Sequence, residues 1–178
     1  MTDYSGLRAL AKLIRSFEKE VKGANLMILF HEHREEIARH IVEGLLGDDL
    51  SHKIRIETSS GEYMNQLAIL RLARNEYTFS RDHQGVFISE INEYTCRITP
   101  HSHGILVYHQ DYPGVIYDVS RVLAENQINI FSMNVSREQK GKSALLVSLT
   151  DEEIPVTLLT KLEKLPQVRQ VLSLQPLN

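Results

Sequence analysis

The chain has 178 residues, of which 42% are hydrophobic and 24% are charged. This composition is ordinary for a globular protein and excludes a disordered chain. Because 20 Lys and Arg residues face 23 Asp and Glu residues, there is no excess of basic side chains to neutralise phosphates, and we expect no nucleic-acid partner. The longest apolar run is far below the roughly 18 residues that a membrane helix requires, so we expect no membrane contact.

The chain contains a single cysteine, Cys96. One cysteine excludes an intrachain disulfide, an all-cysteine zinc site and an iron–sulfur cluster held by this chain alone. It fits a reducing compartment, and because the first residues also lack a secretory signal, we expect a cytoplasmic protein. We interpret Cys96 as a small buried apolar residue in a strand.

The first fifty residues show a helical period on both sides of a short apolar run. Apolar residues three and four positions apart predict a helix over 6–21, and a continuous apolar run over 26–30 predicts a buried strand. A second helical pattern covers 33–46. The order helix, strand, helix indicates an α/β layer.

The period changes to two between residues 53 and 97, where turn clusters separate short alternating runs. This pattern predicts an antiparallel meander. The segment 64–74 fits both a helix and a strand, and we favour the strand.

A polar stretch with a proline and a glycine, 99–104, is the best candidate for a linker. The segment after it has the order β-α-β-β-α-β, which is the ferredoxin-like topology of four antiparallel strands with two helices on one face. We therefore predict an α+β protein, with an N-terminal α/β domain over 1–99 and a ferredoxin-like domain over 104–175. The expected elements are strands at 105–109, 128–136, 144–149 and 168–174 and helices at 115–125 and 155–165.

The free face of such a sheet must be covered. Apolar residues such as Ile128, Ile130, Met133 and Val135 recur along one strand and need a partner surface. Because domains of this shape commonly pair through sheets or strand edges, we expect a homodimer.

The segments 109–116 and 123–130 resemble ACT domains, small β-α-β-β-α-β modules that bind amino acids and regulate enzymes of amino-acid metabolism. The later run Glu163-Lys164-Leu165-Pro166-Gln167-Val168 is similar to the end of that module in phosphoglycerate dehydrogenases and serine dehydratases. The resemblance covers about residues 104–175 and depends on the combination of these segments.

A second resemblance extends over more of the chain. The segments 54–57, 86–92 and above all 131–145 are similar to the β chain of bacterial iron–sulfur L-serine dehydratases. Two features of those chains are missing here, namely a Gly-Pro-Ser-Ser-Ser-His-Thr segment near the start and a glycine-rich stretch before residue 86. The first domain therefore looks like a shortened version of theirs.

The ACT resemblance implies an amino-acid site shared between a strand-to-helix turn of one copy and the second strand of its neighbour. Gly114 gives a ligand close access to the backbone, and the N–H groups of Val115 and Ile116 at the start of a helix suit a carboxylate. Asp111 suits an α-ammonium, and an amide suits a small polar side chain. The residues carried over are His109, Asp111, Gly114, Val115, Ile116 and Asn129.

Structural interpretations of the same residues stay open. Asp111 could cap the helix that follows it, Asn129 could satisfy a turn, and His109 could be a satisfied histidine at a strand end. We interpret the His33, Glu36 and His40 cluster as a solvated helix start rather than a metal site.

We find no catalytic motif and expect no catalytic residue, metal or cofactor in this chain. The dehydratase resemblance implies a regulatory β subunit of an iron–sulfur L-serine ammonia-lyase, with the 4Fe-4S cluster on a partner α chain and a small amino acid such as L-serine as effector. The alternatives are a stand-alone amino-acid sensor without lyase activity and a detached regulatory end of a phosphoglycerate-dehydrogenase-like protein.

Overall fold

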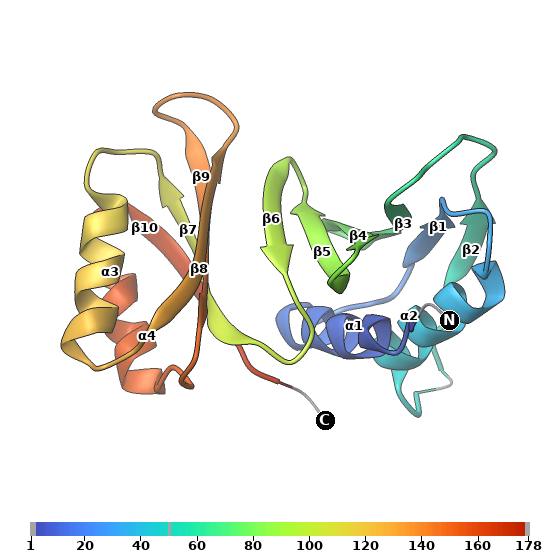
Figure 1. The fold of residues 1–178 in the computed structure, drawn as a ribbon, viewed down its shortest axis with the longest axis horizontal. Helices are drawn as coiled ribbons and strands as arrows, with labels where there is room; N and C mark the ends of the chain where they lie inside the picture. The colour runs from blue at the N-terminus through green and yellow to red at the C-terminus, as the bar shows by residue number, and fades with distance from the viewer. Residues whose placement is uncertain (1–2, 50, 177–178) are drawn as a thin grey trace. The chain divides into compact units, whose positions relative to one another are not determined.

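The computed structural model describes residues 3–49 and 51–176. The chain divides into two compact units with a boundary between Asn92 and Glu93 (Figure 1). The fold class is α+β, as predicted. None of the helices in the described ranges is long and apolar enough to cross a bilayer.

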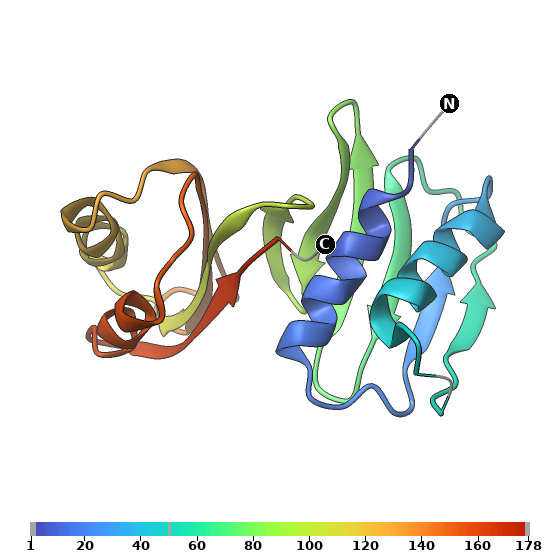
Figure 2. The same cartoon turned by 90° about the horizontal axis from the view of Figure 1, so that it is seen from below.

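The first unit packs two helices against one face of a sheet (Figure 2). Within it the strand order is β2-β1-β3-β4-β5. The two helices contact each other closely at Gly44, where a Cβ atom would meet Ala11 and the backbone oxygen of Arg8. The elements are α1 (Gly6–Phe17), β1 (Asn25–Ile28), α2 (Arg34–Leu46), β2 (Arg55–Thr58), β3 (Gln66–Arg71), β4 (Glu76–Asp82) and β5 (Gly85–Ile91).

The predicted meander is correct for β3, β4 and β5, which pair antiparallel. The strand β2 pairs parallel with β1, so the prediction was wrong for it. The physical reason is the crossover through α2, because a helix between two strands returns the chain to the end from which it started. The ambiguous segment 64–74 contains the strand β3, as we favoured.

The second unit contains the predicted ferredoxin-like fold. Its sheet has the order β10-β7-β9-β8, all antiparallel, with α3 and α4 on one face (Figure 1). The bounds of α3 and β10 coincide with the predicted ones. The elements are β6 (Tyr94–Ile98), β7 (His103–Gln110), α3 (Val115–Glu125), β8 (Ile130–Arg137), β9 (Ser143–Thr150), α4 (Val156–Glu163) and β10 (Val168–Leu174).

Both faces of this sheet carry buried apolar residues. The core between the sheet and the helices is centred on Val107, Leu123 and Leu146, none of which is exposed. Leu106 and Leu145 point to the opposite face, because neighbouring strand residues alternate, and they are also fully buried. On the sheet's other side the preceding strand β6 contacts β8 and β9, so the face is not simply left free for a second copy.

The second unit begins at Glu93 and includes β6, so its boundary lies earlier in the chain than predicted. We predicted a linker over 99–104, but the chain divides at Asn92, and His103 and Gly104 lie inside β7. His103 is half-buried, and its Nδ1 atom is inaccessible and has no hydrogen-bond partner in the described part of the chain. Cys96 lies in β6 and is 8% exposed, as predicted for a buried strand residue.

Candidate functional site

The turn between β7 and α3 ends on a left-handed residue. Gly114 has φ 99° and is the N-cap of α3, and a Cβ atom there would meet nothing within 4 Å. This backbone conformation favours glycine. The N–H group of Asp118 donates to the Gly114 carbonyl at 2.9 Å, which starts the helical ladder. The N–H groups of Val115 and Ile116 precede that bond and therefore have no acceptor within the helix.

Asp111 lies on this turn, and its carboxylate forms hydrogen bonds with residues at a second turn, between β8 and β9. Its Oδ2 accepts from Nη1 of Arg137 at 2.8 Å and from the N–H of Gly141 at 3.0 Å. These contacts, with the Gly141 bond foremost, hold the pKa of Asp111 below its ordinary value. The N-cap of α3 is Gly114, and the Asp111 carboxylate bonds to Arg137 and Gly141 instead, so the interpretation of Asp111 as a helix cap is wrong.

His109, near the end of β7, is 1% exposed. Its Nδ1 lies 2.9 Å from the Gln110 carbonyl, which requires a proton on Nδ1 and leaves Nε2 as an acceptor. The Nε2 atom is buried and has no hydrogen-bond partner in the described part of the chain. The ring also meets Tyr112 edge to face, with 6.3 Å between centroids. His109 is thus a partly satisfied strand-end histidine, because only one of its two ring nitrogens has a hydrogen-bond partner in the described part of the chain.

Asn129 lies apart from this turn within one chain. It precedes β8, whose first residue, Ile130, pairs with Thr150, whereas His109 pairs with Ala144 at the other end of β9. The Asn129 amide donates to Asp151, and its backbone N–H donates to Oε2 of Glu152 at 2.7 Å. The structure therefore brings together five of the six predicted residues and places Asn129 at the opposite end of the sheet.

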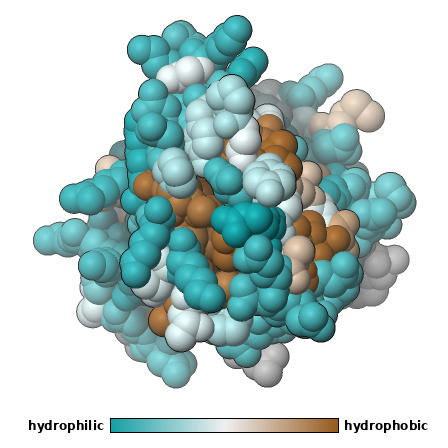
Figure 3. Space-filling model, turned by 90° about the vertical axis from the view of Figure 1, so that its left-hand side faces the viewer, coloured by the Kyte–Doolittle hydropathy of each residue, from teal (hydrophilic) through white to brown (hydrophobic). Residues whose placement is uncertain are grey.

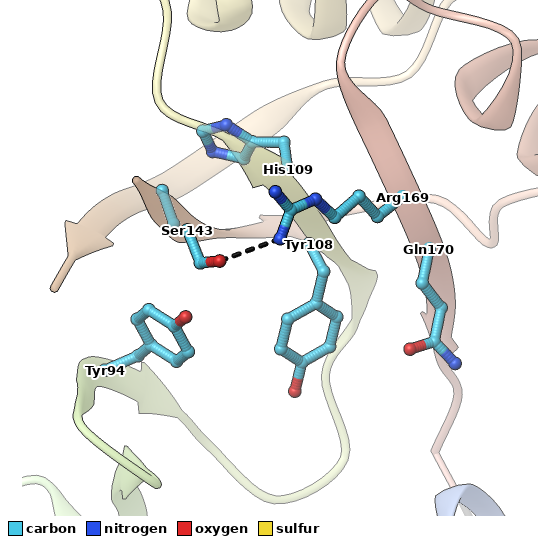
Figure 4. A pocket seen from close by; sticks show the side chains of 7 residues that line it. Tyr94, Tyr108, His109, Ser143, Arg169 and Gln170 are labelled. Carbon is cyan, nitrogen blue, oxygen red and sulfur yellow. Dashed lines mark hydrogen bonds between the residues drawn. The ribbon is translucent and has the colours of Figure 1, made fainter. Parts of the chain in front are cut away.

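A cavity of about 500 Å³ opens on the second unit near His109 (Figure 4). Arg169 extends into it, and Nη1 donates to the Ser143 hydroxyl at 2.8 Å. The rings of Tyr94 and Tyr108 lie edge to face, 6.4 Å between centroids. Burial, followed by the hydrogen bond to Glu138, raises the pKa of Tyr94. The full lining is Tyr94, Tyr108, His109, Ser143, Ala144, Arg169 and Gln170.

The family model of the ACT domain matches residues 103–167. This segment contains the left-handed turn at Gly114 and most of the β-α-β-β-α-β fold. Residues 103–167 form an ACT domain.

The curated relatives that match this chain are longer proteins. The D-3-phosphoglycerate dehydrogenase of Bacillus subtilis (strain 168) is 30% identical over 127 residues, which are 68% of this chain and 24% of that protein. The probable L-serine dehydratase, beta chain, of the same organism is 38% identical over 84 residues, which are 47% of this chain and 38% of that protein. This chain thus spans well under half the length of either relative.

Among solved structures, the crystal structure of the ACT domain from GTP pyrophosphokinase of Chlorobium tepidum is 22% identical. The similarity covers 41% of this chain and 96% of that one, with a TM-score of 0.33.

Several residues of the second unit were missed by sequence reasoning. Arg137, Gly141 and Arg169 each contact a residue far away in the chain, and their own segments carry no pattern that identifies those partners. The Ser143 and Arg169 pair, for example, joins residues of β9 and β10 that are 26 positions apart in the sequence and belong to strands on either side of β7. The only sequence feature that could have pointed to these residues is that each lies at or near the end of a predicted apolar strand.

In the first unit, Glu36 on α2 lies near two histidines. Its carboxylate oxygens are 3.7 Å from Nδ1 of His33 and 4.0 Å from Nε2 of His40. Across residues 3–49 and 51–176, no group of three or more His, Cys, Asp or Glu side chains is placed to hold a metal ion. The His33, Glu36 and His40 cluster is therefore not a candidate metal site.

Proposed function

We propose that the ACT domain binds a small amino acid such as L-serine and that the chain is a regulatory β-type subunit of an iron–sulfur L-serine ammonia-lyase. The observation that carries the first part is the left-handed Gly114 turn, which leads into α3 and follows a partly satisfied histidine near the end of β7. The 38% identity to a probable L-serine dehydratase, beta chain, supports the second part.

The turn offers complementary groups to a zwitterion. The N–H groups of Val115 and Ile116 would accept the carboxylate at the positive end of the helix dipole. The unpartnered Nε2 of His109 would accept a hydrogen bond from the α-ammonium or from a side-chain hydroxyl. Asp111 contacts Arg137 and Gly141 through Oδ2, and neither contact uses Oδ1, which would face the ammonium.

A second copy would supply the amide of Asn129, which lies too far along the sheet to act on its own turn. The edge strand β8 supports a homodimer, because no strand of the described part of the chain pairs with its outer edge in the sheet. Phe131 and Val135 on β8 are 55% and 36% exposed, and Ile116 and Tyr117 at the start of α3 are also exposed. Figure 3 shows apolar patches among hydrophilic side chains on the side of the unit where α3 and α4 lie.

The lyase chemistry would reside on a partner α chain in the cytoplasm. Conversion of L-serine to pyruvate and ammonia would use the 4Fe-4S cluster of that partner as a Lewis acid on the hydroxyl leaving group. The residues of this chain do not fit such a cluster, because its one cysteine is buried in β6. The role of this chain would be to dock, stabilise and respond to the amino acid.

A second candidate is an amino-acid sensor that regulates another enzyme and has no lyase partner. The longer match to a D-3-phosphoglycerate dehydrogenase, over 68% of this chain, favours it, because that match extends well beyond the ACT domain. Both candidates share the amino-acid site and differ in the partner.

Calorimetric titration with L-serine tests the shared part. We expect saturable heat that Asp111→Ala and Asn129→Ala each weaken about ten-fold, as loss of a charge-assisted or amide hydrogen bond would do. Arg121→Ala, on the exposed face of α3, is the control and should bind as the wild type does. The absence of heat with every proteinogenic amino acid would contradict amino-acid binding.

Co-expression with a candidate cysteine-rich α chain tests the partner. The lyase proposal expects a stable complex by size-exclusion chromatography and native mass spectrometry. A homodimer that binds L-serine but never the α chain would favour the stand-alone sensor.

A further inference from the structure

The cavity around Arg169 opens on the sheet face opposite α3 and α4. Val107 and Leu146 belong to the core beneath the helices, so Tyr108 and Leu145 point to the other side of the sheet. Gln170 is the direct cross-strand partner of Tyr108 and shares its face. The start of α3 lies on the helical side, where Val115 joins the core. This cavity and the proposed amino-acid turn therefore meet only at His109.

Arg169 brings an uncompensated positive charge into this concave surface. Its guanidinium carries five donors, of which Nη1 is held by Ser143. Arg169 forms no ion pair with any acidic residue of the ranges 3–49 and 51–176. Figure 4 shows the guanidinium between His109 and Tyr108, at the centre of the cavity. A guanidinium that is held in place and has no acidic partner is suited to bind a carboxylate through two parallel hydrogen bonds.

Two tyrosines supply the apolar wall. Tyr94 is 6% exposed, and its hydroxyl donates to Oε1 of Glu138 at 2.9 Å. Because that hydroxyl is already used, the ring of Tyr94 contributes an apolar and aromatic surface to the cavity. Tyr108 stands edge to face with it. Rings in this arrangement pack well against a further planar group.

We propose that this cavity is a second binding site, which takes a small carboxylic acid with a planar, apolar body such as an aromatic ring. Arg169 binds the carboxylate, Ser143 positions Arg169, and the rings of Tyr94 and Tyr108 pack against the planar body. Gln170 supplies a further amide at the rim. The volume of about 500 Å³ falls within the range of about 300–1,000 Å³ usual for small-molecule sites.

Benzoate is the probe, because it carries a carboxylate and a ring but no ammonium group. The chain has seven tyrosines and no tryptophan, so its intrinsic fluorescence reports on tyrosines such as Tyr94 and Tyr108. We expect saturable binding of benzoate by the full chain at millimolar concentration. Benzylamine, which has the ring with a cation in place of the carboxylate, should not bind.

Arg169→Gln should raise the dissociation constant for benzoate about ten-fold or more, because it removes the charge from the fork. Arg169→Lys should retain part of the affinity. The matched control is Arg121→Gln, which removes an exposed arginine on α3 far from the cavity. Arg169 is itself exposed, so its variants should keep the wild-type circular dichroism. A benzoate affinity unchanged by Arg169→Gln, or no benzoate binding at all, would overturn the proposal.

Competition with L-serine separates this site from the proposed amino-acid site. Saturating L-serine should leave benzoate binding unchanged, because the two sites share only His109, and His109 is not among the residues proposed to bind benzoate. Displacement of benzoate by L-serine would show one shared site and overturn the second one. Failure of L-serine to bind, with benzoate binding intact, would contradict the amino-acid proposal alone.

Discussion

Asp111 and Arg137 join the turn after β7 to the end of β8, with Oδ2 of the aspartate 2.8 Å from Nη1 of the arginine. The same oxygen accepts the N–H of Gly141 at 3.0 Å, so one carboxylate fixes the turn between β8 and β9. That turn is otherwise polar and exposed. The conformation of the proposed amino-acid turn is therefore coupled to the β8–β9 turn through a single ionised group.

The first prediction concerns the titration of this carboxylate. The pKa of Asp111 is lowered from 3.8, the ordinary value for aspartate. The hydrogen bond from Gly141 to the ionised carboxylate should therefore be fully formed above pH 3.8, and it should be lost as the pH falls through the lower pKa of the folded protein. We expect the Gly141 amide resonance to titrate below pH 3.8 by nuclear magnetic resonance. Asp111→Asn should abolish this titration. A midpoint at or above 3.8 would contradict the stated contacts.

A second prediction concerns the core of the ACT domain. Leu146 is fully buried between the sheet and the helices, so Leu146→Ala should lower the free energy of unfolding by about 2–5 kcal/mol. The control is Val156→Ala at the start of α4, which is 75% exposed and should change stability by less than about 0.5 kcal/mol. Urea denaturation measures both. Equal effects of the two substitutions would be inconsistent with the assigned core.

The second unit was predictable in detail because its signals are local. Gly114 and Asn126 bound an apolar pattern of helical period, so α3 was placed correctly. The partner of β2 was not predictable, because alternation within a strand says nothing about which strand lies beside it. The pairing of Asp111 with Arg137 was missed for a similar reason, since 26 residues separate them and only the completed β8–β9 turn brings them together.

A third prediction concerns pH and the first unit. Burial, followed by the charge of Arg39, lowers the pKa of His40, although Glu36 opposes this effect. Between the folded value and the unfolded value near 6.5, the unfolded chain binds more protons. The stability contributed by neutral His40 is thus fully present above pH 6.5 and is lost as the pH falls through the pKa of His40 in the folded protein.

His40→Gln should therefore reduce the acid-induced loss of unfolding free energy that the wild type shows below pH 6.5. His83→Gln, at an exposed turn, is the control and should leave the pH dependence unchanged. Chemical denaturation at a series of pH values measures both slopes. A wild-type slope retained in His40→Gln would refute the role of His40.

The last prediction concerns the contact between α1 and α2. Gly44→Ala would improve the intrinsic helix propensity of α2 by about 1 kcal/mol. The added methyl group, however, would meet Ala11 and the Arg8 backbone at distances that no relaxed Cβ atom occupies. Overpacking of this kind costs typically about 1–3 kcal/mol, so we expect a net loss of stability.

The matched control is Arg39→Ala on the exposed side of α2, where a change within about 0.5 kcal/mol is expected. The double variant Gly44→Ala with Ala11→Gly should recover part of the loss, because it removes one of the two clashing groups while the Arg8 backbone contact remains. A stabilising Gly44→Ala would show that the helices lie farther apart than described.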